Sequence, residues 1–441
     1  MHDLPPESLT ISPPAREWRL GSIGGGSAFS ASALAAFRSE LGLPQGPAIL
    51  SGHQAEIWHA GILAKYFAAL AAARRFGASA AWIVVDQDTG TPEALHYPGT
   101  GWSRRRWQIA PTVREDLPLA LRAPIRPGAL PTDAISPWTT AALARVSSVL
   151  AQGEGEASLA AQFTQALRTL LGPSAESVCF IQASRVATTS LYREFVERML
   201  ADPARCVEAY NAAAVRHPEA GIRPLRTTSP IELPLWLVAP ELGRPAATTR
   251  SAAGATLPRA LTMTALMRMA GCDLFIHGLG GGAYDKVTDE WIGAWLGAGL
   301  APTAVVTATR YARPEDAGPA PDPVAAFDAL RRAHRARHHP VELGDAEAES
   351  LKRALLSEVG VASGPAKRTA YTRMHAVLRD YRERHAPELH DLAARGRALS
   401  GAAKKGRGGA DRTWPFVFLS DAQFAALRSE IDSAFDAGGG A

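Results

Sequence analysis

Short apolar runs alternate along the chain with longer stretches in which apolar residues recur at helical spacing. The runs have the length and composition of buried strands, and they lie at 48–50, 81–85, 178–183, 233–238, 273–277 and 304–307. Buried strands that alternate with helices are typical of a parallel sheet covered by helices. The pattern therefore predicts an α/β core.

The alternation ends near residue 324. From 325 to 400 no strand pattern appears, and Ala, Leu, Arg and Glu recur at helical spacing. Stretches rich in Pro and Gly interrupt the core and mark candidate insertions or linkers, at about 98–137, 239–258 and 312–323. We therefore expect an α/β core over 1–324 with insertions near 98–137 and 185–258, a helical extension over 325–400, and a basic glycine-rich loop with a closing segment over 401–441.

Composition narrows the class of protein. The 441 residues are 46% hydrophobic, which is enough for a large core. No apolar run approaches the roughly 20 residues that cross a bilayer, and the first residues lack the order of a signal peptide, so we expect a cytoplasmic protein without a membrane partner. The three cysteines, at 179, 206 and 272, form no Cys-x-x-Cys pair, and we expect neither a disulfide framework nor a zinc site.

The net charge of +4 suits an anionic small molecule as readily as a nucleic acid. Cationic residues cluster at 331–339 and 404–407. Aromatic side chains that could stack on bases are absent beside the first cluster, which we interpret as a solvated helix face. We therefore expect an anionic small-molecule substrate and no nucleic acid.

The most informative segment is 47–70, where an apolar run stops at Ser51-Gly52 and gives way to a helix start. A strand that turns into a helix brings free N–H groups and the positive end of the helix dipole to one point, where anions bind. The turn contains five residues that we assign to binding a phosphate or carboxylate: Gly52, His53, Gln54, His59 and Gly61.

A second candidate segment is 82–88, in which an apolar strand ends on Asp86-Gln87-Asp88. Ligands in open α/β sheets bind beyond the carboxyl ends of the strands, and a right-handed crossover makes this strand a neighbour of the first. The two aspartates could bind Mg²⁺ or an amine, or act as a base, and the alternative is that they cap a turn. In the functional interpretation His96 lines the same crevice. In the alternative interpretation it is a histidine on the surface.

A third candidate lies at 273–285, where a strand runs into a glycine-dense turn with glycines at 278, 280, 281 and 282, followed by Tyr284. Consecutive glycines let a backbone approach a ligand closely. The spacing satisfies the dinucleotide fingerprint, but the acidic residue expected after the next strand is missing, since that strand ends at Arg310. We interpret the segment as a ligand-facing loop, the alternative being a turn that packing requires.

The segment 401–414 combines cations with glycines between the helical region and a closing Trp-Pro-Phe run. It lacks the order of a P-loop. A mobile cationic lid over an anionic substrate and a disordered linker are both compatible with this composition.

Together these segments resemble the cysteine-adding enzyme family of bacillithiol biosynthesis. The resemblance covers about 47–310 and rests on Ser-Gly-His-Gln at 51–54, Trp-Ile leading to Asp-Gln-Asp at 82–88, and the Gly-rich segment ending in Tyr at 278–284. The family has Thr-Gly-Gln-Gln, Trp-Ile-x-x-Glu-Asp-His-Asp and a similar late glycine loop. The segment 52–61 is also similar to the phosphate loop of class I nucleotidyltransferases, with Ile62 in place of the second His of His-x-Gly-His.

The resemblance implies a Rossmann-like core related to class I nucleotidyltransferases and a coiled-coil-like extension that forms a homodimer. It implies a ligase that joins an amino acid, cysteine in that family, to the amine of a small sugar conjugate, with ATP or ADP and Mg²⁺ as candidate cofactors. The expected catalytic residues are His53, Asp86 and Asp88. The expected cofactor-binding residues are Gly52, Gln54, His59, Gly61, Gly278, Gly280, Gly281 and Gly282, and the expected substrate-binding residues are His96, Tyr284 and Arg310.

Two other functions fit the same residues. One is a nucleotidyltransferase acting on a small phosphorylated molecule, and the other is a non-catalytic protein that binds a nucleotide or sugar. All of these interpretations require that His53, His59, Asp86, Asp88 and the glycines from 278 meet in one cleft at the carboxyl edge of the sheet.

Overall fold

The computed structural model describes residues 7–21, 29–239, 241, 243–252, 254–312, 323–405 and 411–436. The chain divides into two compact units. One consists of Met1–Pro5, Pro98–Arg104 and Ala317–Asp411, and the other of Pro6–Tyr97, Arg105–Asp316 and Arg412–Ala441. The larger unit contains the sheet, and the smaller one contains the helical extension.

The larger unit is built on a six-stranded sheet in the order β1-β11-β10-β2-β3-β6. Its strands are β1 (Ser8–Ser12), β2 (Ala48–Gln54), β3 (Ser79–Val85), β6 (Val178–Gln182), β10 (Leu274–His277) and β11 (Thr303–Thr309). All neighbours pair in parallel except β1, which runs antiparallel to β11. The predicted α/β core is confirmed, as a Rossmann-like, mostly parallel sheet.

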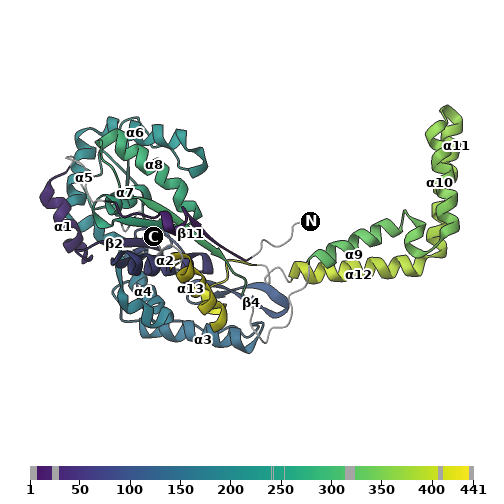
Figure 1. The fold of residues 1–441 in the computed structure, drawn as a ribbon, viewed down its shortest axis with the longest axis horizontal. Coiled ribbons are helices and arrows are strands. Elements are labelled where there is room, and N and C mark those ends of the chain that lie inside the picture. The colour runs from purple at the N-terminus through teal and green to yellow at the C-terminus, as the bar shows by residue number, and fades with distance from the viewer. Residues whose placement is uncertain are drawn as a thin grey trace. The chain divides into compact units, whose positions relative to one another are not determined.

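Helices cover both faces of this sheet (Figure 1). The core on one face contains side chains of α2 (Ala60–Phe76), α3 (Pro137–Gln152), α4 (Leu159–Leu171) and α13 (Asp421–Asp436). The core on the other face contains side chains of α1 (Ala31–Leu41), α5 (Ser190–Ala201), α6 (Pro203–Arg216), α7 (Ala260–Leu266) and α8 (Leu279–Leu296). Side chains alternate between the two cores along a strand, as in β3, where Trp82 joins the first core and Ile83 the second.

The apolar run at 233–238 was expected in the parallel sheet, and this expectation is wrong. It forms β7 (Glu232–Leu237), the centre of a separate antiparallel sheet with β8 (Ala246–Thr248) and β9 (Thr256–Pro258). A short apolar run has the same composition in either kind of sheet, so only its partners distinguish them. The insertion after β3 carries the paired strands β4 (Ala94–Gly99) and β5 (Ser103–Gln108).

Short helical turns connect the larger elements. They are a π-helical turn at Met267–Gly271 and 3₁₀ turns at Ala15–Glu17, Thr100–Trp102, Leu119–Leu121, Gly172–Ser177, Ala183–Thr188, Pro218–Ala220, Pro340–Leu343 and Phe416–Phe418.

The extension is helical, as its sequence predicts. It contains α9 (Pro323–Ala336), α10 (Ala346–Val361), α11 (Gly364–Arg384) and α12 (Ala386–Lys405), with α9 packed on α12 and α10 on α11. Tyr381 is buried and donates a 2.6 Å hydrogen bond from its hydroxyl to the carbonyl oxygen of Ala336, which fastens α11 to the end of α9. Among the helices that the structure describes, none has both the length and the apolar character for crossing a membrane.

Candidate functional site

The candidate site lies where β2 and β10 run side by side. From β2 the chain passes through α2 to β3 on one side, and from β10 it passes through α8 to β11 on the other, so these neighbours form the switch point of the sheet. Ligands of open α/β sheets bind at such points, because two helices begin there from opposite faces. A cavity of about 450 Å³ occupies this position.

The cavity contains most of the residues that the sequence singled out. The predicted residues on its wall are Gly52, His53, Gln54, His59, Gly61, Asp88, Gly278, Gly280, Gly281 and Tyr284. The structure thus brings together segments more than 200 residues apart in the sequence, because β10 pairs with β2 through Ile276 and Ser51.

His59 is the N-cap of α2. Its Nδ1 accepts a 3.0 Å hydrogen bond from the backbone N–H of Gly61. Burial lowers the pKa of His59 to about 4, so the ring is neutral near pH 7. Since Nδ1 accepts, the single proton lies on Nε2, which is left as a hydrogen-bond donor at the cavity wall. The side chain therefore reinforces the anion-binding character of the helix start.

His53 lies at the end of β2 with its Nε2 3.0 Å from Oε1 of Glu56. Burial lowers the pKa of His53 despite the opposing effect of Glu56, which favours the neutral ring. When Nε2 donates to the carboxylate, Nδ1 carries the free lone pair. A histidine held in this way by a carboxylate can act as a general base.

The glycines from 278 form a helix start instead of the expected loop. Gly278 is the N-cap of α8, and the following glycines lie in its first turn. A Cβ on Gly281 would overlap the imidazole of His277, and one on Gly282 would lie 2.6 Å from Cγ2 of Val305. Both positions require glycine because of packing. Gly282 is absent from the cavity wall, whereas Gly278, Gly280 and Gly281 belong to it.

The structure corrects the expected position of Asp86. Its buried carboxylate accepts 2.6 Å hydrogen bonds from the backbone N–H and the hydroxyl of Ser184, at the 3₁₀ turn that follows β6. Burial raises the pKa of Asp86 to about 6. Ile83, Val85 and Gln87 line the cavity while Asp86 does not, because alternate positions of an extended segment face opposite ways. Asp86 thus caps a neighbouring turn.

Asp88 does reach the cavity, where it pairs with Arg244. The carboxylate oxygen lies 2.6 Å from the guanidinium of Arg244, which also stacks on the ring of Trp236 with 4.0 Å between the guanidinium carbon and the ring centroid. Asp88 is therefore an acceptor at the cavity wall whose charge is balanced by Arg244, from the segment between β7 and β8.

Two predicted substrate-binding residues lie elsewhere. His96 is in β4 and is absent from the cavity wall. Arg310 donates 2.9 Å hydrogen bonds to the carbonyl oxygens of Ser8 and Thr309 and forms an ion pair with Glu430. Arg310 therefore joins the N-terminal strand to the C-terminal helix and is absent from the wall of the cavity.

Sequence reasoning missed Lys65, which is buried in α2 and lines the cavity. Its Nζ donates a 2.6 Å hydrogen bond to the carbonyl oxygen of Gly52 and lies 5.5 Å from the ring centroid of Trp82. Burial lowers the pKa of Lys65 to about 7. The available signal was a lysine in the apolar part of α2, where no other charged residue precedes Arg74, because a buried charge is costly unless it is paired or used.

Three further residues on the cavity wall were not among the predicted site residues. Oε1 of Gln87 is buried without a hydrogen-bond partner in the described part of the chain. His277 has its Nε2 3.0 Å from Oδ1 of Asp285. Arg412 adds a cation to the wall. Arg412 belongs to the predicted cationic segment 401–414, of which residues 406–410 lie outside the described residues.

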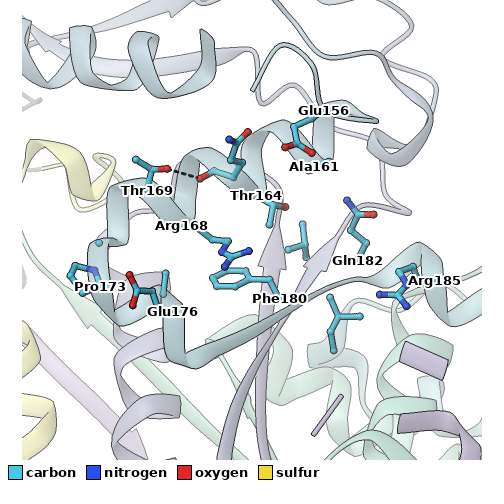
Figure 2. Close-up of a pocket in the computed structure, with 15 residues that line it drawn as sticks. Glu156, Ala161, Thr164, Arg168, Thr169, Pro173, Glu176, Phe180, Gln182 and Arg185 are labelled. Carbon is cyan, nitrogen blue, oxygen red and sulfur yellow. Dashed lines mark hydrogen bonds between the residues drawn. The ribbon is translucent and has the colours of Figure 1, made fainter. Parts of the chain in front are cut away.

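A second cavity, of about 720 Å³, lies beside the edge strand β6 and helix α4 (Figure 2). Arg168 stacks on Phe180 there, with 5.7 Å between the guanidinium carbon and the ring centroid, and Glu156 and Glu176 are also on the wall. It contains none of the predicted site residues and no side chain from the switch point. We therefore place the functional site in the smaller cavity.

Within the described residues no group of three or more His, Cys, Asp or Glu side chains is arranged to hold a metal ion. Comparison with models of protein families and with curated proteins gives no match for this sequence.

Proposed function

We propose that the cavity binds an anionic small molecule and forms a carbon–nitrogen bond between an activated carboxyl group and an amine. The observation that supports this most is the meeting of two helix starts, the Nε2 donor of His59 and the Glu56-bound base His53 in one cavity. An oxyanion cradle and an adjacent base are the minimum that amide formation needs.

In the proposed step the amine nitrogen attacks the carbonyl carbon of the activated carboxyl group. The carbonyl oxygen gains negative charge, which Nε2–H of His59 and the N–H groups at the start of α2 stabilise. Nδ1 of His53 takes the proton that the amine loses, and the leaving group departs with its electron pair as the amide carbonyl forms. Gln87 and Asp88 supply acceptors that would hold the amine before attack.

The identity of the substrates comes from the sequence resemblance. It suggests an amino acid, cysteine in the resembled family, and an amine on a small sugar conjugate. A nucleotide, ATP or ADP, would supply the activating phosphate, and Mg²⁺ would accompany it. The same resemblance is the basis for proposing a relation to class I nucleotidyltransferases.

The test begins with isothermal titration of the full-length protein with ATP and ADP, with and without Mg²⁺. Product formation from cysteine and a glucosamine–malate conjugate is then followed by mass spectrometry. We expect nucleotide binding, and we expect His53→Ala to lower the rate by about 100-fold or more because the base is removed. His96→Ala, outside the cavity, is the matched control.

Absence of binding to either nucleotide, together with absence of product, would reject the proposal. Binding without turnover for any substrate pair would favour a non-catalytic nucleotide- or sugar-binding protein.

A nucleotidyltransferase is the second candidate, because His59 caps the helix after the first core strand, as in the His-x-Gly-His phosphate loop. Ile62 stands where that loop has its second histidine. Release of pyrophosphate during incubation with nucleoside triphosphates and phosphorylated sugars or alcohols would identify this activity. Its absence over the whole panel would remove it.

A further inference from the structure

Lys65 is an unusual residue for the interior of a protein. Lysines are rarely buried unless a carboxylate pairs with them. Lys65 is only 4% exposed, and in the described part of the chain its polar contact is one backbone carbonyl oxygen, that of Gly52, with no ion pair. Its Nζ therefore has bonding capacity that the fold does not use, at the wall of a cavity.

Several groups on the wall of the same cavity are donors or cations. His59 presents Nε2–H, Arg412 lies on the same wall, and α2 and α8 begin there. The carboxylate of Asp88, on the same wall, is paired with Arg244, which balances its charge. An anionic group in the cavity would therefore meet several donors.

Burial disfavours the ammonium form and lowers the pKa of Lys65 to about 7. A much larger fraction of the molecules then carries the free amine at pH 7 than for an exposed lysine, for which it is roughly one in a few thousand. The free amine is the nucleophilic form.

We propose that Lys65 is a nucleophilic amine that captures small aldehydes or ketones bearing a phosphate or carboxylate, as an imine within this cavity. The nitrogen lone pair attacks the carbonyl carbon, the carbonyl oxygen takes up the two amine protons, and it leaves as one water molecule when the C=N bond forms. His53 can carry these protons, because its Nδ1 accepts and releases them. The inference uses only the cavity and does not depend on amide formation.

The experiment uses pyridoxal 5′-phosphate as probe, with cyanoborohydride to reduce the imine and peptide mass spectrometry to locate it. The chain has six lysines, at 65, 286, 352, 367, 404 and 405, so each site can be quantified. Lys286 is the internal standard, because its side chain is 64% exposed. At pH 7 we expect Lys65 to be modified at least about tenfold faster than Lys286.

Two comparisons on the unmodified sequence test the anion part of the inference. Pyridoxal without phosphate should label Lys65 more slowly than the phosphorylated probe, and pyrophosphate should protect Lys65 while leaving Lys286 unaffected. Labelling of Lys65 should also fall as the pH drops below 7, since the amine becomes protonated.

Lys65→Met should abolish the fast adduct and Lys286→Met should retain it. Equal modification of Lys65 and Lys286 would overturn the inference, and so would fast labelling of Lys65 that pyrophosphate leaves unchanged. Because the comparison of the two lysines is made in the unsubstituted protein, it decides the matter even where Lys65→Met fails to fold. Selective labelling without amide-forming activity would reject only the proposed function.

Discussion

At the scale of single residues, two histidines at one helix start acquire different chemistry from their partners. His59 accepts from the backbone of its own helix and is left with a donor, while His53 is bound to Glu56 and is left with an acceptor. Burial keeps both rings neutral near pH 7. A hydrogen-bond donor on His59 and an acceptor on His53 thus lie at the same cavity while both rings stay neutral.

The low pKa of His59 predicts that the folded protein loses stability in acid. The pKa is about 4 in the folded protein and 6.5 for an unperturbed histidine, so the unfolded chain binds more protons as the pH falls between these values. The free energy of unfolding should therefore decrease by up to about 3 kcal/mol from pH 6.5 to pH 4 through this residue. His59→Asn keeps a cap acceptor and removes the titration.

Urea denaturation at several pH values measures this effect. We expect the substituted protein to lose less stability on acidification, whereas His375→Asn, at an exposed position in α11, should follow the parent curve. Identical pH profiles for His59→Asn and the parent would contradict the assignment.

At the scale of elements, the start of α8 shows why glycines gather at 278–282. The room for a side chain differs between neighbouring residues of the first turn. A Cβ on Gly280 would have no atom within 4 Å, whereas a Cβ on Gly281 would overlap the imidazole of His277. Packing therefore requires glycine at 281 but not at 280.

These neighbouring glycines form a matched pair for mutation. Gly281→Ala should destabilise the protein by about 1–3 kcal/mol, because His277 must move. Gly280→Ala should be neutral or stabilise by up to about 1 kcal/mol, since alanine favours the helix and meets open space. Chemical denaturation measures both changes, and equal effects of the two substitutions would show that the described helix start is incorrect.

At the scale of the whole molecule, the exposed apolar residues of the helical extension bear on whether the protein forms a dimer. The extension exposes large apolar side chains, among them Leu351 and Leu356 of α10, which are 50% and 44% exposed. Apolar residues at helical spacing beside charged residues are typical of helices that pack against a partner. Homodimerisation through the extension accordingly remains our prediction.

Light scattering at micromolar concentration tests this prediction. We expect the mass of two chains for the parent and of one chain for the double substitution Leu351→Glu and Leu356→Glu. Val215→Glu, at a 69% exposed position of α6 in the core, is the control and should keep the parent mass. A monomer mass for the parent would refute the prediction.

The sequence by itself determined most local elements of this protein and the strand ends at which the candidate residues lie. Apolar residues recur every two positions in a strand and about every 3.6 in a helix, and both periods are visible over a few neighbouring positions. The strand at 48–50, the helix after Gly61 and the helical extension could therefore be predicted. The same logic placed His53 and His59 together, because a few residues separate them.

Only the tertiary structure decided which elements became neighbours and which partners their polar side chains bind. Asp86 binds Ser184 and Arg310 binds Glu430 because distant segments arrive beside them, while the run at 233–238 pairs antiparallel with strands of its own. Lys65 reaches the cavity because β10 and α8 complete its wall. Such contacts join residues far apart in sequence, and their energies depend on burial and partner geometry that local periodicity does not encode.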